Sequence, residues 1–107
     1  MSTGAVVLGG VFKSKEIDAF AQGLSATLAP RLAATAQPRT DSSALAGLID
    51  EVEARAVEFS RAQRLGVYGK ARLCRTLGES LAQAGADPAA TETIVRRYIR
   101  RIARARA

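Results

Sequence analysis

Five arginines near the end of the chain have a spacing that suits phosphate binding. They lie in the segment DPAATETIVRRYIRRIARARA, which spans residues 87–107. On an α-helix, which turns by about 100° per residue, all five fall within an arc of about 140°. They are Arg96, Arg97, Arg100, Arg101 and Arg104. Because one guanidinium can donate two parallel hydrogen bonds to a phosphate, this arginine face predicts contact with an anionic partner.

An anionic partner would also relieve repulsion within the arginine face. Like charges one helical turn apart repel by a few tenths of a kcal/mol per pair. Lys70, Arg72 and Arg75, from an earlier predicted helix, would extend the cationic surface. The partner that we expect is DNA or RNA, bound in a sequence-tolerant way, because contacts to phosphate carry no base information.

Other interpretations of the arginine face remain open. The arginines could be solvated, or could pair with acidic residues of the helix predicted at 42–65. They could also meet an anionic membrane surface, although the opposite arc lacks the Trp, Phe or Leu typical of such helices. That arc holds Thr91, Ile94, Val95, Tyr98, Ile99 and Ile102 and is predicted to face the core. The main alternative function is a helical adaptor or oligomerisation module, with helix 42–65 as its contact surface and the arginines meeting an acidic protein.

The charge of the chain is unevenly distributed. Residues 1–60 carry five Lys or Arg against seven Asp or Glu, a net charge of −2. Residues 61–107 carry eleven against three, a net charge of +8. Such asymmetry indicates either an anionic partner or the docking of one half of the chain on the other.

No set of residues in the chain predicts catalysis. The 107 residues include no histidine, which is the most frequent general base and a common metal ligand. Cys74 lies beside Leu73 and one turn before Leu77 on an apolar stripe, so we expect a buried, unreactive thiol. Neither a P-loop nor a GxGxxG glycine pattern occurs. We therefore predict a non-enzymatic protein without a cofactor.

Four carboxylates between positions 50 and 58 are the one candidate for a metal site. They are Asp50, Glu51, Glu53 and Glu58. Arg55 lies four residues after Glu51 and three before Glu58, a spacing typical of ion pairs on a helix surface. Divalent cations usually need more converging oxygens than one helix face presents. We expect ion pairs here and no metal.

Cysteine content and hydropathy predict a cytoplasmic protein. A single cysteine, Cys74, excludes a disulfide within the chain and fits a reducing compartment. No run approaches the ~18 consecutive apolar residues of a membrane span. The apolar stretch 5–12 is also too short for the core of a signal peptide, and no basic residues precede it.

Hydrophobic spacing and capping residues predict the elements that position these side chains. We predict helices at about 14–32, 42–65, 67–84 and 88–105. Ser14 is the expected N-cap of the first helix, and Pro30 is expected to end or kink it. Gly66 suits the left-handed position after the second helix. Asp87 followed by Pro88 is an N-cap followed by proline at the first helical position, which predicts the start of the last helix.

These elements predict one all-α domain of four helices at 14–107, preceded by a short, loosely ordered N-terminal arm at 1–13. Residues 33–41 are predicted to be a linker. The predicted core comprises Ile17, Phe20, Leu24, Leu45, Leu48, Ile49, Val52, Phe59, Leu73, Leu77, Leu81, Val95, Tyr98 and Ile102. Leu45, Val52 and Phe59 repeat every seven residues, which leaves a homo-oligomer through a short coiled coil open.

Overall fold

The chain folds into four α-helices. In the computed structural model, α1 spans Ser2–Leu32, α2 Ser42–Ala62, α3 Val67–Gln83 and α4 Pro88–Arg104. The structure describes residues 2–33 and 42–105, with side chains from Ser14 in the first segment and from Ser43 in the second. Over these residues it confirms the predicted all-α fold of four helices.

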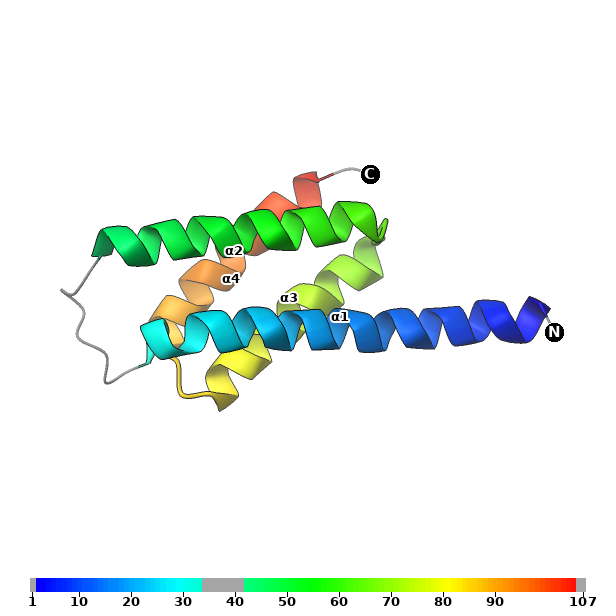
Figure 1. The fold of residues 1–107 in the computed structure, drawn as a ribbon, viewed down its shortest axis with the longest axis horizontal. Helices are drawn as coiled ribbons and strands as arrows, with labels where there is room; N and C mark the ends of the chain where they lie inside the picture. The colour runs from blue at the N-terminus through cyan, green and yellow to red at the C-terminus, as the bar shows by residue number, and fades with distance from the viewer. Residues whose placement is uncertain (1, 34–41, 106–107) are drawn as a thin grey trace.

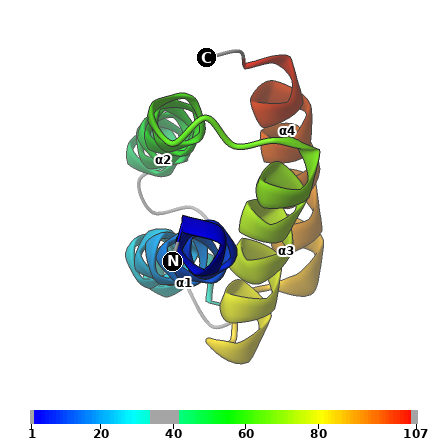
Figure 2. The same cartoon turned by 90° about the vertical axis from the view of Figure 1, so that its right-hand side faces the viewer.

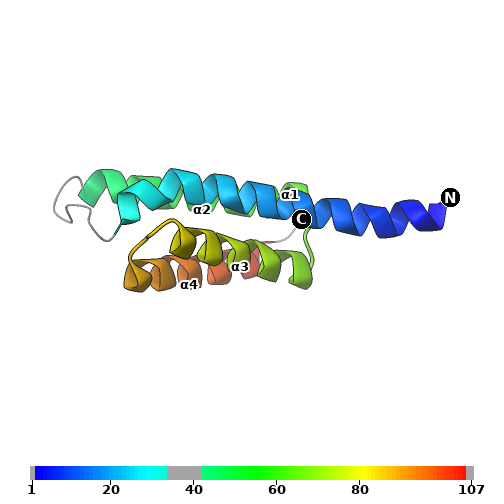
Figure 3. The same cartoon turned by 90° about the horizontal axis from the view of Figure 1, so that it is seen from below.

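The four helices form two layers. α1 and α2 lie in one layer and α3 and α4 in the other, as Figures 2 and 3 show. α1 makes its most extensive contact with α3, whereas the contacts of α2 with α1 and α4 are smaller. The N-terminal part of α1 extends beyond the ends of the other helices (Figure 1). Among the described helices, none covers the face of the α3–α4 layer that points away from α1 and α2.

The core lies between the two layers. Eight of the predicted core side chains are buried, namely Ile17, Leu24, Val52, Leu73, Leu77, Leu81, Tyr98 and Ile102. The six others, Phe20, Leu45, Leu48, Ile49, Phe59 and Val95, are half-buried at its edge. Four of these six belong to α2, which packs on its neighbours along a narrow strip. Phe59 stacks on Phe20 with ring centroids 4.0 Å apart, and this pair joins α2 to α1.

α1 begins earlier than the sequence pattern indicated. Its first residue is Ser2, so Ser14, the expected N-cap, lies inside the helix. Residues 2–13 contain no proline, and the glycines among them each weaken a helix by about 1 kcal/mol relative to alanine without ending it. Pro30 falls in the last turn, and the helix ends at Leu32 as expected. Residues 34–41 of the predicted linker lie outside the described residues.

The turns after α2 and α3 show where these two helices end. α2 ends at Ala62, and the left-handed residue after it is Arg64, with φ of 52°, so the prediction that Gly66 takes this position is wrong. The earlier end lets the side chain of Leu65 turn into the core. After α3, Gly85 has φ of 87°, a conformation that glycine adopts without strain. Within residues 2–33 and 42–105, none of the helices has the length and apolarity needed to cross a membrane.

Candidate nucleic-acid interface

α4 presents the arginine face, and three features determine how it is oriented. The carboxylate of Asp87 accepts a hydrogen bond from the Ala90 N–H at 3.0 Å, which confirms the predicted N-cap. Ile94, Tyr98 and Ile102 are buried on one side of the helix. The hydroxyl of Tyr98 donates to the Ile49 carbonyl of α2 at 2.7 Å, and burial raises the pKa of this phenol. These contacts fix α4 against α2 and leave its arginines on the side of the helix away from the buried residues.

Arg97 is held by carboxylates of α2. Its guanidinium donates to Asp50 and, from Nε at 3.0 Å, to Glu53. These hydrogen bonds, first that from Glu53 and then that from Asp50, raise the pKa of Arg97, so its charge is fixed. Within the arginine face, Arg97 therefore joins α4 to α2. Asp50 and Glu53, two of the four carboxylates considered as a metal site, thus accept hydrogen bonds from Arg97. A third, Glu51, pairs with Arg55 at 2.6 Å, as its spacing predicts.

Arg96 pairs within its own helix. Its guanidinium lies 2.6 Å from the Glu92 carboxylate, one turn earlier on α4. Both side chains are well exposed, at 70% and 62%. An exposed pair with this spacing contributes about 0.3–0.5 kcal/mol, so Arg96 can exchange this partner for another anion.

Arg72 is not available as a phosphate contact. It forms two hydrogen bonds to the Asp18 carboxylate of α1, at 2.9 and 2.7 Å, and Thr76 donates a third at 3.1 Å. The bond from Arg72 is the main reason that the pKa of Asp18 is lowered, and the same bond raises the pKa of Arg72. This group connects α1 to α3 across 54 residues of sequence, a contact that no local spacing predicts.

Lys70 and Arg75 lie on α3 in different surroundings. The Lys70 ammonium donates to the Ala105 carbonyl at 2.8 Å and so caps the end of α4. Arg75 is exposed and, among the described residues, has no ion pair. Of the three α3 cations that we expected to extend the arginine face, two thus stabilise the fold.

Arg100, Arg101 and Arg104, on the last turns of α4, remain exposed and form no ion pair with any described residue. The Lys70–Ala105 hydrogen bond holds this end of α4 beside the start of α3, and a short turn connects α3 to the end of α2. Figures 1 and 2 show the three helix ends on the same side of the molecule. The end of α2 contributes Arg61, and the turn after it contributes Arg64; both are exposed, and sequence reasoning missed both.

We call the group Arg61, Arg64, Arg100, Arg101 and Arg104 the basic end. Residues 59–78 and 93–105 contain no Asp or Glu, and Glu58, one turn before Arg61, borders the group on α2. The acidic residues Glu79, Asp87 and Glu92 lie toward the end of α3 and around the start of α4, at the opposite end of this helix pair. The ring of Tyr68, 69% exposed on the first turn of α3, lies at the same end of the molecule as the basic end.

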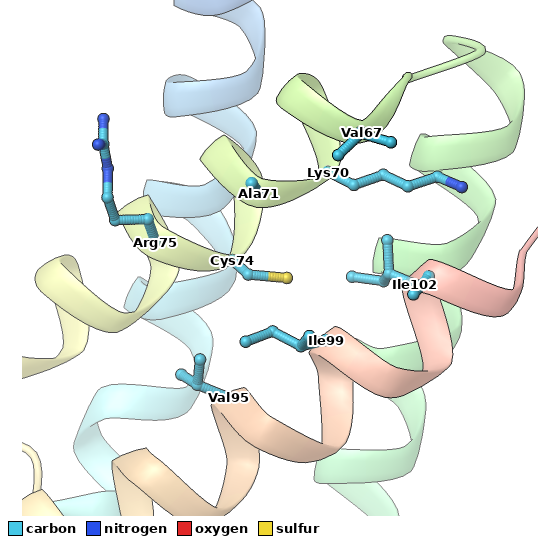
Figure 4. A pocket seen from close by; sticks show the side chains of 9 residues that line it. Val67, Lys70, Ala71, Cys74, Arg75, Val95, Ile99 and Ile102 are labelled. Atoms are coloured by element: carbon cyan, nitrogen blue, oxygen red, sulfur yellow. The ribbon is translucent and has the colours of Figure 1, made fainter.

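An apolar groove runs along the uncovered seam between α3 and α4. It has a volume of about 380 Å³, and its walls include Val67, Ala71, Cys74, Val95, Ile99 and Ile102. Figure 4 shows Cys74, Ile99 and Ile102 pointing toward one another across the seam. Ile99, which we expected to face the core, is 47% exposed. The prediction is wrong for this residue because, within residues 2–33 and 42–105, no helix covers the outer face of the seam.

Cys74 forms part of the floor of this apolar groove. The thiol is buried, as predicted, and burial raises its pKa to about 11. A thiol that stays protonated at neutral pH is a poor nucleophile. Among the side chains that the structure describes, no three of the His, Cys, Asp and Glu type gather in a way that could hold a metal ion.

Comparisons with protein-family models, with curated proteins and with solved structures find no match for this chain.

Proposed function

We propose that the chain binds nucleic acid through the basic end, without catalysis and without reading base sequence. The convergence of arginines from α2 and α4 around the start of α3, with no carboxylate paired to them among the described residues, supports this proposal most strongly. Nearby cations that lack carboxylate partners repel one another, and a polyanion replaces that repulsion with attraction. Guanidinium groups are well suited to phosphate because their donors match its oxygens.

The proposed contact set differs from the arginine face of the sequence. Arg72 and Arg97 hold carboxylates of α1 and α2, so they stabilise the domain. Arg61 and Arg64 replace them, because the packing of α2 beside α4 brings them to the same end. Arg75 lines the groove between α3 and α4, and Arg96 pairs with Glu92.

Single-stranded DNA or RNA is the form that this surface favours. The exposed ring of Tyr68 provides a flat apolar face at this end of the molecule, and its hydroxyl accepts a hydrogen bond from Arg72 at 3.2 Å. Stacking of a base on an aromatic ring contributes about 1–3 kcal/mol and tolerates any base, whereas bases inside a duplex are already stacked. The cytoplasm, predicted from the single cysteine, is the compartment in which we propose that this binding occurs.

Fluorescence anisotropy with labelled oligonucleotides of unrelated sequences tests the proposal. Single strands should bind more tightly than duplexes of the same length, and Tyr68→Ala should remove that difference. The change should weaken single-strand binding by about 5- to 150-fold, the loss expected for one stacked base. Arg31→Ala, at an exposed position on α1, is the matched control and should change nothing. No binding of any oligonucleotide at ~50 mM salt and micromolar protein would exclude this function.

A further inference from the structure

The apolar groove between α3 and α4 is a second surface, on the other side of α4 from the basic end. At about 100° per residue, Val95, Ile99 and Ala103 line one edge of α4, whereas Arg101 and Arg104 point at least ~100° away from them and Arg100 at least ~60°. A second hollow of about 360 Å³ continues along the seam, and Val95 lines both. Together they follow the seam along much of the two helices, each of 17 residues or about 25 Å.

This seam is open and apolar, which separates it from a small-molecule pocket. Val67 is 88% exposed at one end of it, and Ile99 is half exposed in its middle. Small-molecule sites enclose most of their ligand and orient it with a few converging polar groups. In the apolar groove, the polar side chains of the lining are Lys70 and Arg75, with Cys74 protonated on the floor. Lys70 already donates to the end of α4, and Arg75 extends outward (Figure 4).

A third helix fits the shape of the seam. The α3 wall carries small residues, Ala71, Gly78 and Ala82, at intervals of seven and four. Small residues let another helix approach closely, and apolar side chains spaced every three or four residues on that helix would fill the spaces between them. Exposed apolar surface rimmed by charged residues is characteristic of a protein–protein contact.

The charged residues around the apolar groove indicate which kind of partner helix would bind there. The lining of the apolar groove includes two cations, Lys70 and Arg75, and no Asp or Glu. On the wall of the second hollow, Glu92 is paired with Arg96, so this pair adds little net charge to the seam. We propose that the apolar groove binds an amphipathic α-helix of a partner protein, with acidic residues flanking its apolar stripe. A second copy of the α3–α4 face is a poor occupant, because it would bring the same cations against these.

Three synthetic helices of about 18 residues can test this proposal on the full chain. They share one stripe of leucines and carry Glu, Gln or Lys at the flanking positions. The Glu peptide should bind most tightly, the Gln peptide about three- to tenfold more weakly, and the Lys peptide weakest, as expected for two or three exposed charge pairs. Arg75→Glu should remove most of the difference between the Glu and Lys peptides, whereas Arg31→Glu, far from the groove, should preserve it.

Two variants test the groove itself. Ile99→Asp introduces a charge on its wall, and Ala71→Trp fills it from an exposed position, so a folding defect in one leaves the other informative. Each should weaken the Glu peptide at least tenfold and leave the salt dependence of oligonucleotide binding unchanged, which separates this proposal from the basic end. Failure of all three peptides to bind would overturn the proposal. Equal affinity for the Glu and Gln peptides would overturn the claim that acidic residues flank the apolar stripe of the partner helix. A wild-type dimer that Ile99→Asp converts to monomer would assign the groove to a second copy.

Discussion

Arg97 and Arg101 lie one turn apart on α4, yet they have different surroundings. Arg97 donates to Asp50 and Glu53 of α2, whereas Arg101 is exposed and has no ion pair among the described residues. The two residues share a helix, a residue type and a predicted face. The difference arises from the helix alongside, because α2 carries Asp50 and Glu53 near its middle and Arg61 at its end. Whether an arginine stabilises the domain or remains free to bind therefore depends more on the side chains of the neighbouring helix than on its own helix.

The largest effect should follow from removing the side chain that aligns the two helices. Tyr98 is fully buried, and its hydroxyl holds the Ile49 carbonyl. Tyr98→Ala should destabilise the domain by about 3–5 kcal/mol, which is typical for a buried aromatic. Tyr98→Phe keeps the ring and should cost about 1 kcal/mol for the lost hydrogen bond. Denaturant unfolding measures both, and equal stability of the Ala variant and the wild type would contradict the placement of the core.

Alkaline pH should produce the next largest effect. Burial raises the pKa of Cys74 from about 9.0 to about 11 and also raises that of Tyr98. Above pH 9 the unfolded chain releases these protons while the folded chain retains them, so stability should fall as pH rises from about 9 to 11. The Cys74 contribution to this loss is on the order of 2 kcal/mol by pH 11. Cys74→Ala should flatten part of the decline, and an identical pH profile for variant and wild type would show that the thiol is exposed.

A smaller loss should separate Arg97 from Arg101. Arg97→Ala should destabilise the domain by about 1 kcal/mol, because it removes a cation shared by two carboxylates, one of them mostly covered. Arg101→Ala should leave thermal stability within about 0.5 kcal/mol of wild type, as is usual for surface changes. Arg55→Ala, which breaks an exposed pair within α2, is the reference for an ion pair with little effect. A melt in which Arg101→Ala is the more damaging change would reverse the two roles.

Local patterns in the sequence were sufficient to predict most of the helices. The N-cap at Asp87 and the glycine at position 85 predicted the start of α4 and the end of α3 to within a residue or two. Caps and turns depend on residues close in the chain, so local sequence is sufficient to locate them. The start of α1 differed by twelve residues, since Ser14 resembles an N-cap equally well inside a helix. The spacing of Ile99 correctly indicated an apolar side of α4. It could not show that none of the described helices packs against that side.

The candidate site was less predictable because it depends on contacts between distant segments. The Arg72–Asp18 and Arg97–Glu53 pairs join residues more than 40 positions apart. A helical wheel shows one helix at a time, so both arginines appear on it without a partner. Arg61 joins the basic end only because the end of α2 lies beside the end of α4. The excess of positive charge over residues 61–107 was the one signal that included it.

The salt dependence of oligonucleotide binding tests the difference between Arg97 and Arg101 most directly. Each phosphate contacted on a single strand contributes about −0.7 to the slope of log affinity against log salt, so five arginines predict a slope of about −3.5. Arg101→Ala and Arg104→Ala should each reduce its magnitude by about 0.7, whereas Arg97→Ala should leave the slope unchanged. Equal reductions for Arg97→Ala and Arg101→Ala, or a slope near zero for the wild type, would contradict the assignment of the basic end as the phosphate-binding surface.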